Sequence, residues 1–233
     1  MRLDKYISNQ TVLSRSEAVK AIRSGKVSVD NNCVRDPKTK VSEAKNKVSL
    51  EGKEVKFREN IYLMMNKPVG YISSTEDRNH KTVLELLPDE YSCRNPFPCG
   101  RLDIDTTGLV ILTDDGPWAH NITSPKKKCF KTYIFEAFTE LSEESQQKLE
   151  EGVFLAGDDK ITAPAKIKHQ SGRTYELQIS EGRFHQVKRM LEAVDNKVLK
   201  LHRKAIGKIV LDSTLASGEF RELTEDEIDL FRQ

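Results

Sequence analysis

The chain has 233 residues, which is enough for one large domain or two small ones with a buried core. Hydrophobic residues make up 37% and charged residues 32% of it, as in an ordinary globular protein. No apolar run approaches the roughly 18 residues that span a bilayer, and residues 1–5 lack the apolar core of a secretory signal. We therefore expect a cytoplasmic protein with no membrane partner.

Charge is distributed unevenly along the chain, although the net charge is only +2. Residues 1–60 hold 14 Lys and Arg against 8 Asp and Glu, a balance of +6, and the remainder has a balance of −4. A basic front end indicates contact with a polyanion, and a solvated lysine-rich surface is the alternative. The four cysteines have no CxxC spacing, so we expect free thiols rather than a zinc site.

Residues 1–60 have the pattern of two short helices followed by a hairpin. Leu3, Tyr6 and Ile7 recur at helical spacing, and residues 14–17 form the capping box of a second helix. An apolar stripe and a closing glycine complete that helix, and a strand, a turn and a strand follow it. The stripe consists of Ala18, Val19 and Ile22, and the closing glycine is Gly25. The first strand contains Val27 and Val29, the turn is at 30–32, and the second strand contains Cys33 and Val34.

The pattern SRxxAxxxIxxGxVxVD across this segment is similar to the S4 RNA-binding domain. The resemblance implies that basic residues here contact RNA phosphates, whereas each residue taken alone could simply be solvated. The candidates are Arg15, Lys20 and Arg23 on the second helix, together with Arg2, Lys5 and Lys26. Residues 53–60 are highly charged and lack a clear period, so we expect a linker there. The expected domains are 1–58 and 59–233.

The second domain opens with a strand-like run at residues 61–65 and a turn at Pro68 and Gly70. Further on, two glycines bracket the loop Gly100-Arg-Leu-Asp-Ile-Asp-Thr-Thr-Gly108, and the apolar run 109–112 predicts a buried strand after it. Such a loop, with Arg101 beside Asp103, can hold one ionised carboxylate still. That arrangement suits nucleophilic or acid/base chemistry.

The rest of the chain mixes strands and helices without the regular alternation of a parallel fold. Strands are predicted at 132–138, 175–179, 197–201 and 209–211, and helices at 142–152, at 185–194 and after the capping box 224–227. We therefore expect an α+β fold in which the second domain is a mostly antiparallel mixed sheet with flanking helices.

Three segments of this domain resemble the pseudouridine synthases that act on ribosomal RNA. They are GRLDIDTTGLV, KTY at 131–133 and EGRFHQVKRM at 181–190, and Lys67-Pro68 matches a further, mainly structural motif. The resemblance implies that Asp103 is the catalytic carboxylate and that the target base packs against Tyr133. It also implies that Lys188, where many relatives have arginine, forms the ion pair with Asp103. Near RNA, phosphate contact is expected of Arg183 and Arg189, and a structural or RNA-contacting role of His185.

Asp105 raises an alternative, because two carboxylates two residues apart, with Asp114 and Asp115 nearby, are a possible magnesium site for phosphoryl transfer. Arg101 would place a competing cation beside such a metal. We expect Asp105 to order the loop through bonds to Thr106, Thr107 or local backbone instead, without a counter-ion of its own.

The resemblance is to the small-subunit branch of the family. It implies isomerisation of one flipped-out uridine of 16S rRNA, without metal or organic cofactor, by a protein that is monomeric and meets this RNA in a partly assembled small subunit. Two further alternatives are a sister synthase acting on 23S rRNA and a non-catalytic S4-domain protein of ribosome assembly.

Overall fold

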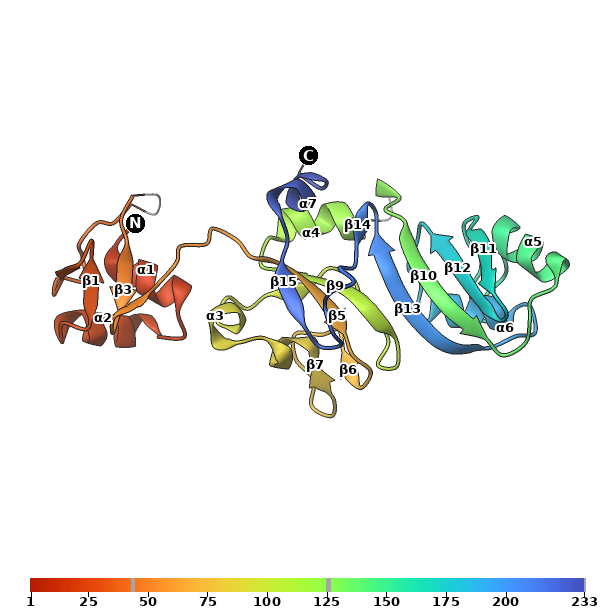
Figure 1. Ribbon diagram of the computed structural model, residues 1–233, viewed down its shortest axis with the longest axis horizontal. Coiled ribbons are helices and arrows are strands. Elements are labelled where there is room, and N and C mark those ends of the chain that lie inside the picture. Colours follow the sequence, from red (N-terminus) through yellow and green to blue (C-terminus); the bar gives the residue numbers. More distant parts are fainter. Residues whose placement is uncertain (43–44, 125–126, 233) are drawn as a thin grey trace. The chain divides into compact units, whose positions relative to one another are not determined.

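The computed structural model describes residues 1–42, 45–124 and 127–232 and divides the chain into two compact units (Figure 1). The first comprises Met1–Ile61 with Leu87–Pro96, and the second comprises Tyr62–Leu86 with Phe97–Gln233. Within the described ranges, no helix combines the length and the apolar character that crossing a membrane requires.

The first unit packs two helices against a small sheet. The helices are α1 (Leu3–Gln10) and α2 (Arg15–Arg23), and the sheet has the order β2-β1-β3-β4. Its strands are β1 (Val27–Val29), β2 (Asn32–Cys33), β3 (Val48–Leu50) and β4 (Lys53–Glu54). Apolar residues from both helices and the sheet form one core, which includes Leu3, Tyr6, Ile7, Ala18, Ile22, Val27 and Val48.

The local signals in this unit act as the sequence predicts. Ser14 caps α2 with both halves of the capping box in place, and Gly25 follows the helix at φ +81°. The hairpin turn between β1 and β2 places Asp30 and Asn31 at positive φ, a conformation that these residue types tolerate well. Val19, expected in the apolar stripe, is only half-buried, and Ala21 takes its place.

The linker expected at residues 53–60 is partly wrong. Lys53 and Glu54 form β4, and Val55 is buried in the core of the first unit, where the Tyr6 hydroxyl donates to its carbonyl (2.9 Å). This strand has no signal in the sequence, because both of its residues are charged and exposed and the only buried apolar residue beside it is Val55. The short helix α3 (Asp89–Ser92) also belongs to this unit.

The second unit is built on a sheet with the order β11-β12-β10-β13-β9-β5-β15, with β14 beside β13 and β8 beside β9. Its strands are β5 (Tyr62–Lys67), β8 (Phe97–Pro98), β9 (Thr107–Thr113), β10 (Lys131–Ala137), β11 (Lys166–Ser171), β12 (Thr174–Ile179), β13 (Val198–Ile206), β14 (Ile209–Val210) and β15 (Phe220–Glu222). All neighbours run antiparallel except β13 and β9, so the expected mostly antiparallel mixed sheet is confirmed.

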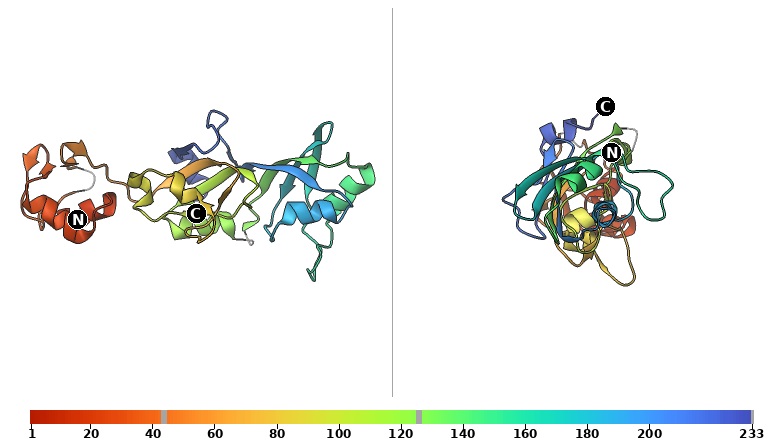
Figure 2. Two further views of the ribbon diagram at one scale, coloured as in Figure 1. Left: turned by 90° about the horizontal axis from the view of Figure 1, so that it is seen from below. Right: turned by 90° about the vertical axis from the view of Figure 1, so that its right-hand side faces the viewer.

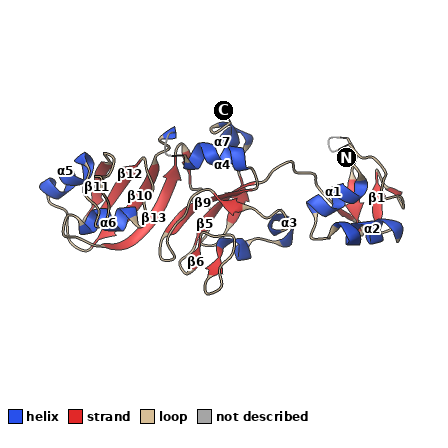
Figure 3. Ribbon diagram, turned by 180° about the vertical axis from the view of Figure 1, so that it is seen from behind, coloured by secondary structure: helices blue, strands red, loops and turns tan. Residues whose placement is uncertain are grey.

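Helices flank this sheet (Figure 2, Figure 3). They are α4 (Gly116–Thr123), α5 (Glu143–Glu151), α6 (Gln186–Glu192) and α7 (Glu225–Asp229), with a 3-10 turn at Val83–Leu86 and a small ladder of β6 (Tyr71–Ile72) with β7 (Lys81–Thr82). Helices α4 and α7 cover a core that contains Met64, Leu109, Ile111 and Trp118. Helix α6 contacts β13.

Helix α4 was not predicted from the sequence, because the turn residues before it dominate the pattern. Asp115 is its N-cap: one carboxylate oxygen accepts from Trp118 N (3.0 Å) and the other from the Tyr62 hydroxyl (2.7 Å). Strands β11 and β15 were also missed, since most of their residues are polar and exposed or half-buried.

Asp115, one of the carboxylates of the possible magnesium site, serves as the N-cap of α4. Among the described residues, no group of three or more His, Cys, Asp or Glu could hold a metal ion.

Strands β9 and β13 meet at only two residue pairs, and one of them is Gly108 with Arg203. Gly108 has φ +101°, and a Cβ there would contact the Arg203 carbonyl oxygen and lie 2.8 Å from the Arg203 nitrogen. Only glycine allows this approach. The junction matters for function, because the Asp103 loop ends at Gly108.

Replacing Gly108 with alanine should therefore lower the free energy of unfolding by about 2 kcal/mol or more, through backbone strain and a forced separation of β9 from β13. Gly116→Ala is the matched control, because no atom of the described residues lies within 4 Å of the place that its methyl group would take and its φ is not positive. Urea denaturation of both variants measures the difference. Equal stability would show that the junction tolerates a side chain.

Candidate active site

A cleft of about 710 Å³ opens in the second unit where the loop after β8 faces α6. It is lined by residues of that loop (99–106), by the starts of β10 and α6, by the segment 179–185 and by β13. In Figure 3, α6 lies beside β10, β12 and β13. The volume of the cleft is in the range of pockets that bind small ligands. Burial raises the pKa of the Cys99 thiol in this cleft to about 12, so this thiol stays protonated.

Lys67, whose side chain is fully buried, holds the loop of residues 99–106, which we call the cleft loop. Its Nζ donates to the carbonyls of Thr106 (2.7 Å), Pro68 (3.0 Å) and Ile104 (3.4 Å). Burial lowers the pKa of Lys67 to about 8, although the nearby Asp105 and Asp103 oppose this effect. The lysine of the Lys-Pro pair thus orders the loop that carries both carboxylates.

Arg203 fixes the loop from the side of β13 and was not singled out by sequence reasoning. Its Nε donates to the Leu109 carbonyl (2.8 Å) and its Nη1 lies 3.5 Å from the Arg101 carbonyl, so one guanidinium reaches both ends of the loop. The side chain is 3% exposed, and it also lines the cleft. A lone arginine in a strand gives no local signal, because its partners lie about 100 residues away in the chain.

Lys188 from α6 reaches across the cleft and contacts both carboxylates of the loop. Its Nζ lies 3.1 Å from Asp103 Oδ2 and 2.6 Å from Asp105 Oδ1. The expectation that Asp105 lacks a counter-ion is therefore wrong. A lysine ammonium has three donors that point in different directions, so one Nζ can bridge the two carboxylates.

The electrostatics of the pair Lys188 and Asp105 favour the charged forms of both groups. Burial alone would lower the pKa of Lys188, but its hydrogen bonds to Asp105 and Asp103 raise it. Burial alone would raise the pKa of Asp105, but the hydrogen bond from Lys188 lowers it. Asp105 is 61% exposed at its side chain and Asp103 25%, so Asp103 is the carboxylate that faces the enclosed part of the cleft.

Two further groups stand near Asp103. His185, in the left-handed conformation at φ +48°, brings its Nε2 to 3.5 Å from Asp103 Oδ1. Its ring stacks on Phe184, which is 76% exposed at the cleft and was not predicted as functional. Arg101 is exposed and lines the cleft, but it forms no ion pair with the part of the chain that the structure describes. Lys188 therefore provides the charge that Arg101 was expected to give Asp103.

Tyr133 lines the same cleft from β10, with 9% of its surface exposed. Lys131, two residues earlier on the same face of the strand, also lines it, and burial lowers the pKa of this lysine. An aromatic ring that lines the same cleft as Asp103 offers a surface for a planar base.

Arg183 and Arg189 are occupied within the protein. Arg183 contacts Asp158 (3.0 Å) and the carbonyls of Lys160 and Ile161, and Arg189 contacts Asp158 (2.6 Å) and the carbonyl of Ala156. These contacts change our interpretation of both residues from phosphate contact to attachment of the loop 156–161 to the start of α6. The sequence could not show this, because Asp158 is 25 or more residues away.

The basic residues expected to contact RNA in the first unit are all exposed. Arg2 and Arg15 share the buried Asp4 carboxylate at 2.8 and 3.4 Å, and Lys26 pairs with Glu51 at 2.6 Å. The other three expected residues, Lys5, Lys20 and Arg23, form no ion pair within the described residues. They can therefore bind an anion without breaking an internal contact.

Comparison with known proteins agrees with this architecture. Residues 61–193 match the family model of RNA pseudouridylate synthases, and residues 1–45 match the S4 domain. The chain belongs to the RNA pseudouridine synthase family, whose members are isomerases, as the cleft motifs predicted.

The curated relatives extend over almost the whole chain. The ribosomal small subunit pseudouridine synthase A of Escherichia coli (strain K12) is 44% identical over 229 residues, which cover 98% of each protein. An uncharacterized RNA pseudouridine synthase of Bacillus subtilis is 44% identical over 100% of this chain and 99% of its own length. A crystal structure of a pseudouridylate synthase matches with 41% identity and a TM-score of 0.70 over 98% of each chain.

The buried position of Lys67 predicts a pH effect on isomerisation. Its pKa is about 8, so a rise in pH through this value removes the charge that holds the cleft loop, and the rate should fall. The free energy of unfolding should not fall over the same pH range. The folded state favours the neutral Lys67 amine, whereas in the unfolded chain the amine loses its proton only near pH 10.4, so a rise in pH favours the folded state. Lys67→Met should be slower and lack this decline. Single-turnover rates and melting temperatures from pH 6.5 to 9.5 measure both, and superimposable profiles would contradict the role given to Lys67.

Proposed function

We propose that this protein converts one specific uridine of 16S rRNA into pseudouridine, with Asp103 as the catalytic carboxylate. The observation that carries the proposal is the position of Asp103 in the cleft. Its carboxylate lies 3.1 Å from the Lys188 ammonium, with the Tyr133 ring lining the same cavity. A carboxylate paired with a cation, in a cavity that an aromatic ring also lines, fits chemistry on a planar base.

The reaction is an isomerisation and balances without a co-reactant. The N1–C1′ glycosidic bond of uridine breaks, the uracil turns within the cleft, a C5–C1′ bond forms, and the proton leaves C5 while N1 gains one. The carboxylate of Asp103 can assist by attack on the sugar, by addition to the base or by removal of a proton, and each role requires its ionised form. Lys188 sets a positive charge 3.1 Å from this carboxylate.

The enclosed cleft implies that the target nucleotide leaves its stack in the RNA. Extrusion costs a few kcal/mol, which contacts elsewhere on the RNA must offset. In this proposal Tyr133 stacks on the base, and Phe184 and Arg101, both exposed at the cleft, contact the nucleotide and its neighbours. The first unit, with Lys5, Lys20 and Arg23, supplies phosphate contacts.

The choice of 16S rRNA rests on relatives that are named as ribosomal small subunit pseudouridine synthases and are 44% identical over nearly the full length. From the same likeness we propose a monomer acting in the cytoplasm on a partly assembled small subunit. A sister activity on 23S rRNA would use the same cleft, and a non-catalytic assembly factor would use mainly the first unit.

Mapping pseudouridine across 16S and 23S rRNA from cells that lack this gene tests the target. We expect one 16S position to lose the modification and to regain it when the wild-type gene is restored. Loss of a 23S position alone would overturn the proposed target. An unchanged pattern in both RNAs would remove the enzymatic proposal.

Asp103→Asn should lower the single-turnover rate by roughly 10²- to 10⁴-fold while RNA affinity stays within about twofold, because the amide keeps the shape and loses the charge. Asp195→Asn is the matched control: Asp195 is exposed outside the cleft, and its φ of +54° is one that asparagine tolerates. Tritium release from C5-labelled RNA measures the rate. Wild-type turnover in Asp103→Asn would exclude Asp103 as the catalytic group.

The phosphate contacts of α2 predict a salt effect. The double variant Lys20→Ala/Arg23→Ala should bind 16S rRNA more weakly and with a log–log salt dependence shallower by about 1.4 to 1.8, the value for two lost phosphate contacts. Lys38→Ala/Lys53→Ala removes the same charge from exposed positions of the same unit. Filter binding at several KCl concentrations compares them. An equal loss in both variants would mean that total charge, and not α2, determines binding.

A further inference from the structure

A second cavity of about 450 Å³ lies on the face of the sheet opposite the catalytic cleft. The alternation at the start of β10 shows this: Lys131 and Tyr133 line the cleft, whereas Thr132, together with Phe130 just before the strand, lines the second cavity. Successive side chains of a strand point to opposite faces. The two cavities are thus separated by the thickness of one strand.

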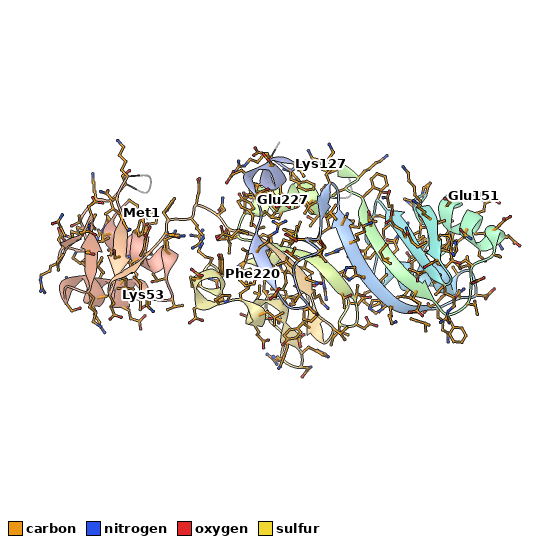
Figure 4. All side chains as sticks on the ribbon, in the orientation of Figure 1. Met1, Lys53, Lys127, Glu151, Phe220 and Glu227 are labelled. Carbon is orange, nitrogen blue, oxygen red and sulfur yellow. The ribbon has the colours of Figure 1, made fainter. Side chains whose placement is uncertain are left out.

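Register confirms which residues share the second face. Thr132 pairs with Gln178, and Gln178 pairs with Lys166, so these three form one row across β10, β12 and β11. All three line the cavity. We call this cavity the lysine pocket, after Lys127, Lys128, Lys166 and Lys208 in its lining. Figure 4 labels Lys127, which lies near the α7 segment.

The floor of the lysine pocket is apolar and closely packed. Gly207, at φ +58°, lets Phe231 and Cys129 approach, since a Cβ there would lie 2.9 Å from the Phe231 ring. The Gly207 nitrogen donates to the Phe130 carbonyl (2.7 Å), and Phe231 packs edge-on against the buried Trp118. The pocket is therefore a built feature of the domain.

The charge of the lysine pocket has one sign. No Asp or Glu occurs among its described lining residues. Lys128, Lys166 and Lys208 are exposed and form no ion pair with the described part of the chain. Such a site attracts an anion. Phe130 is 41% exposed, and Lys166 Nζ lies 5.9 Å from its ring centre, so a cation and an aromatic face stand side by side.

We propose that the lysine pocket binds a nucleotide of the RNA substrate away from the target uridine, with its phosphate on the lysines and its base on Phe130. A phosphate joined to a planar base matches the combination of ammonium groups and an exposed ring, which is the usual composition of single-strand binding sites. The inference rests on RNA being the substrate, as proposed above. The lysine pocket and the catalytic cleft lie on opposite faces of the sheet at β10, so one RNA can contact both faces.

The test compares Lys166→Gln/Lys208→Gln with the control Lys148→Gln/Lys200→Gln. The control removes equal charge from lysines of the same unit that lie outside the pocket and are paired with Glu144 and Glu136. With a 16S rRNA transcript, the pocket variant should raise the Kd about 5- to 20-fold and make the salt dependence shallower by about 0.7 to 1.8. The rate at saturating RNA should be unchanged, so that KM rises and kcat does not. Equal affinity of the two variants would overturn the proposal.

Crosslinking identifies the occupant directly and does not depend on catalysis. A 4-thiouridine-substituted 16S transcript should crosslink to the peptide that contains Phe130, and the crosslink should weaken in the pocket variant and in Phe130→Leu. If the crosslink forms while no pseudouridine does, the pocket stands and the proposed function fails. If affinity falls for the intact small subunit but not for the transcript, the occupant is a protein and the proposal is overturned.

Discussion

The contact of one lysine with two carboxylates organises the catalytic half of this protein. Lys188 brings α6 to the loop after β8 and holds Asp103 and Asp105 at 3.1 and 2.6 Å. Two carboxylates in one short loop would repel each other, and the lysine offsets this repulsion. The ion pair therefore joins the two walls of the cleft and sets a positive charge beside Asp103, so the shape of the site and its charge distribution depend on the same contact.

Groups distant in the chain hold that loop in place. Lys67 supports it through three backbone carbonyls, Arg203 reaches both of its ends, and Gly108 lets β13 approach closely enough for this to happen. A site that extracts a base from folded RNA, as proposed above, benefits from a rigid frame, because binding energy then goes to the RNA contacts and not to ordering the enzyme. The lysine pocket would add to that binding energy from the other face of the sheet.

Sequence reasoning predicted the features that depend on a local residue pattern. It did not predict side-chain contacts between residues that are far apart in the chain. The capping box at Ser14, the buried strand after Gly108 and the α+β class follow from spacing and composition, and the structure confirms them. The pairing of Asp105 with Lys188 and the occupation of Arg183 by Asp158 connect residues 25 to 83 positions apart, which no local pattern reveals. Strands with few apolar residues, such as β4, gave too weak a signal.

The central claim is that isomerisation depends on the contact between the Lys188 ammonium and the Asp103 carboxylate, and its most direct test is the single-turnover rate of Lys188 variants at saturating RNA. We predict that Lys188→Gln is slower by about 10²-fold or more, because charge stabilisation is lost in an enclosed site. Lys188→Arg, which keeps the charge, should recover a large part of the rate. A rate close to that of the wild type in Lys188→Gln would contradict the account and would direct attention to His185, whose Nε2 lies 3.5 Å from the same carboxylate.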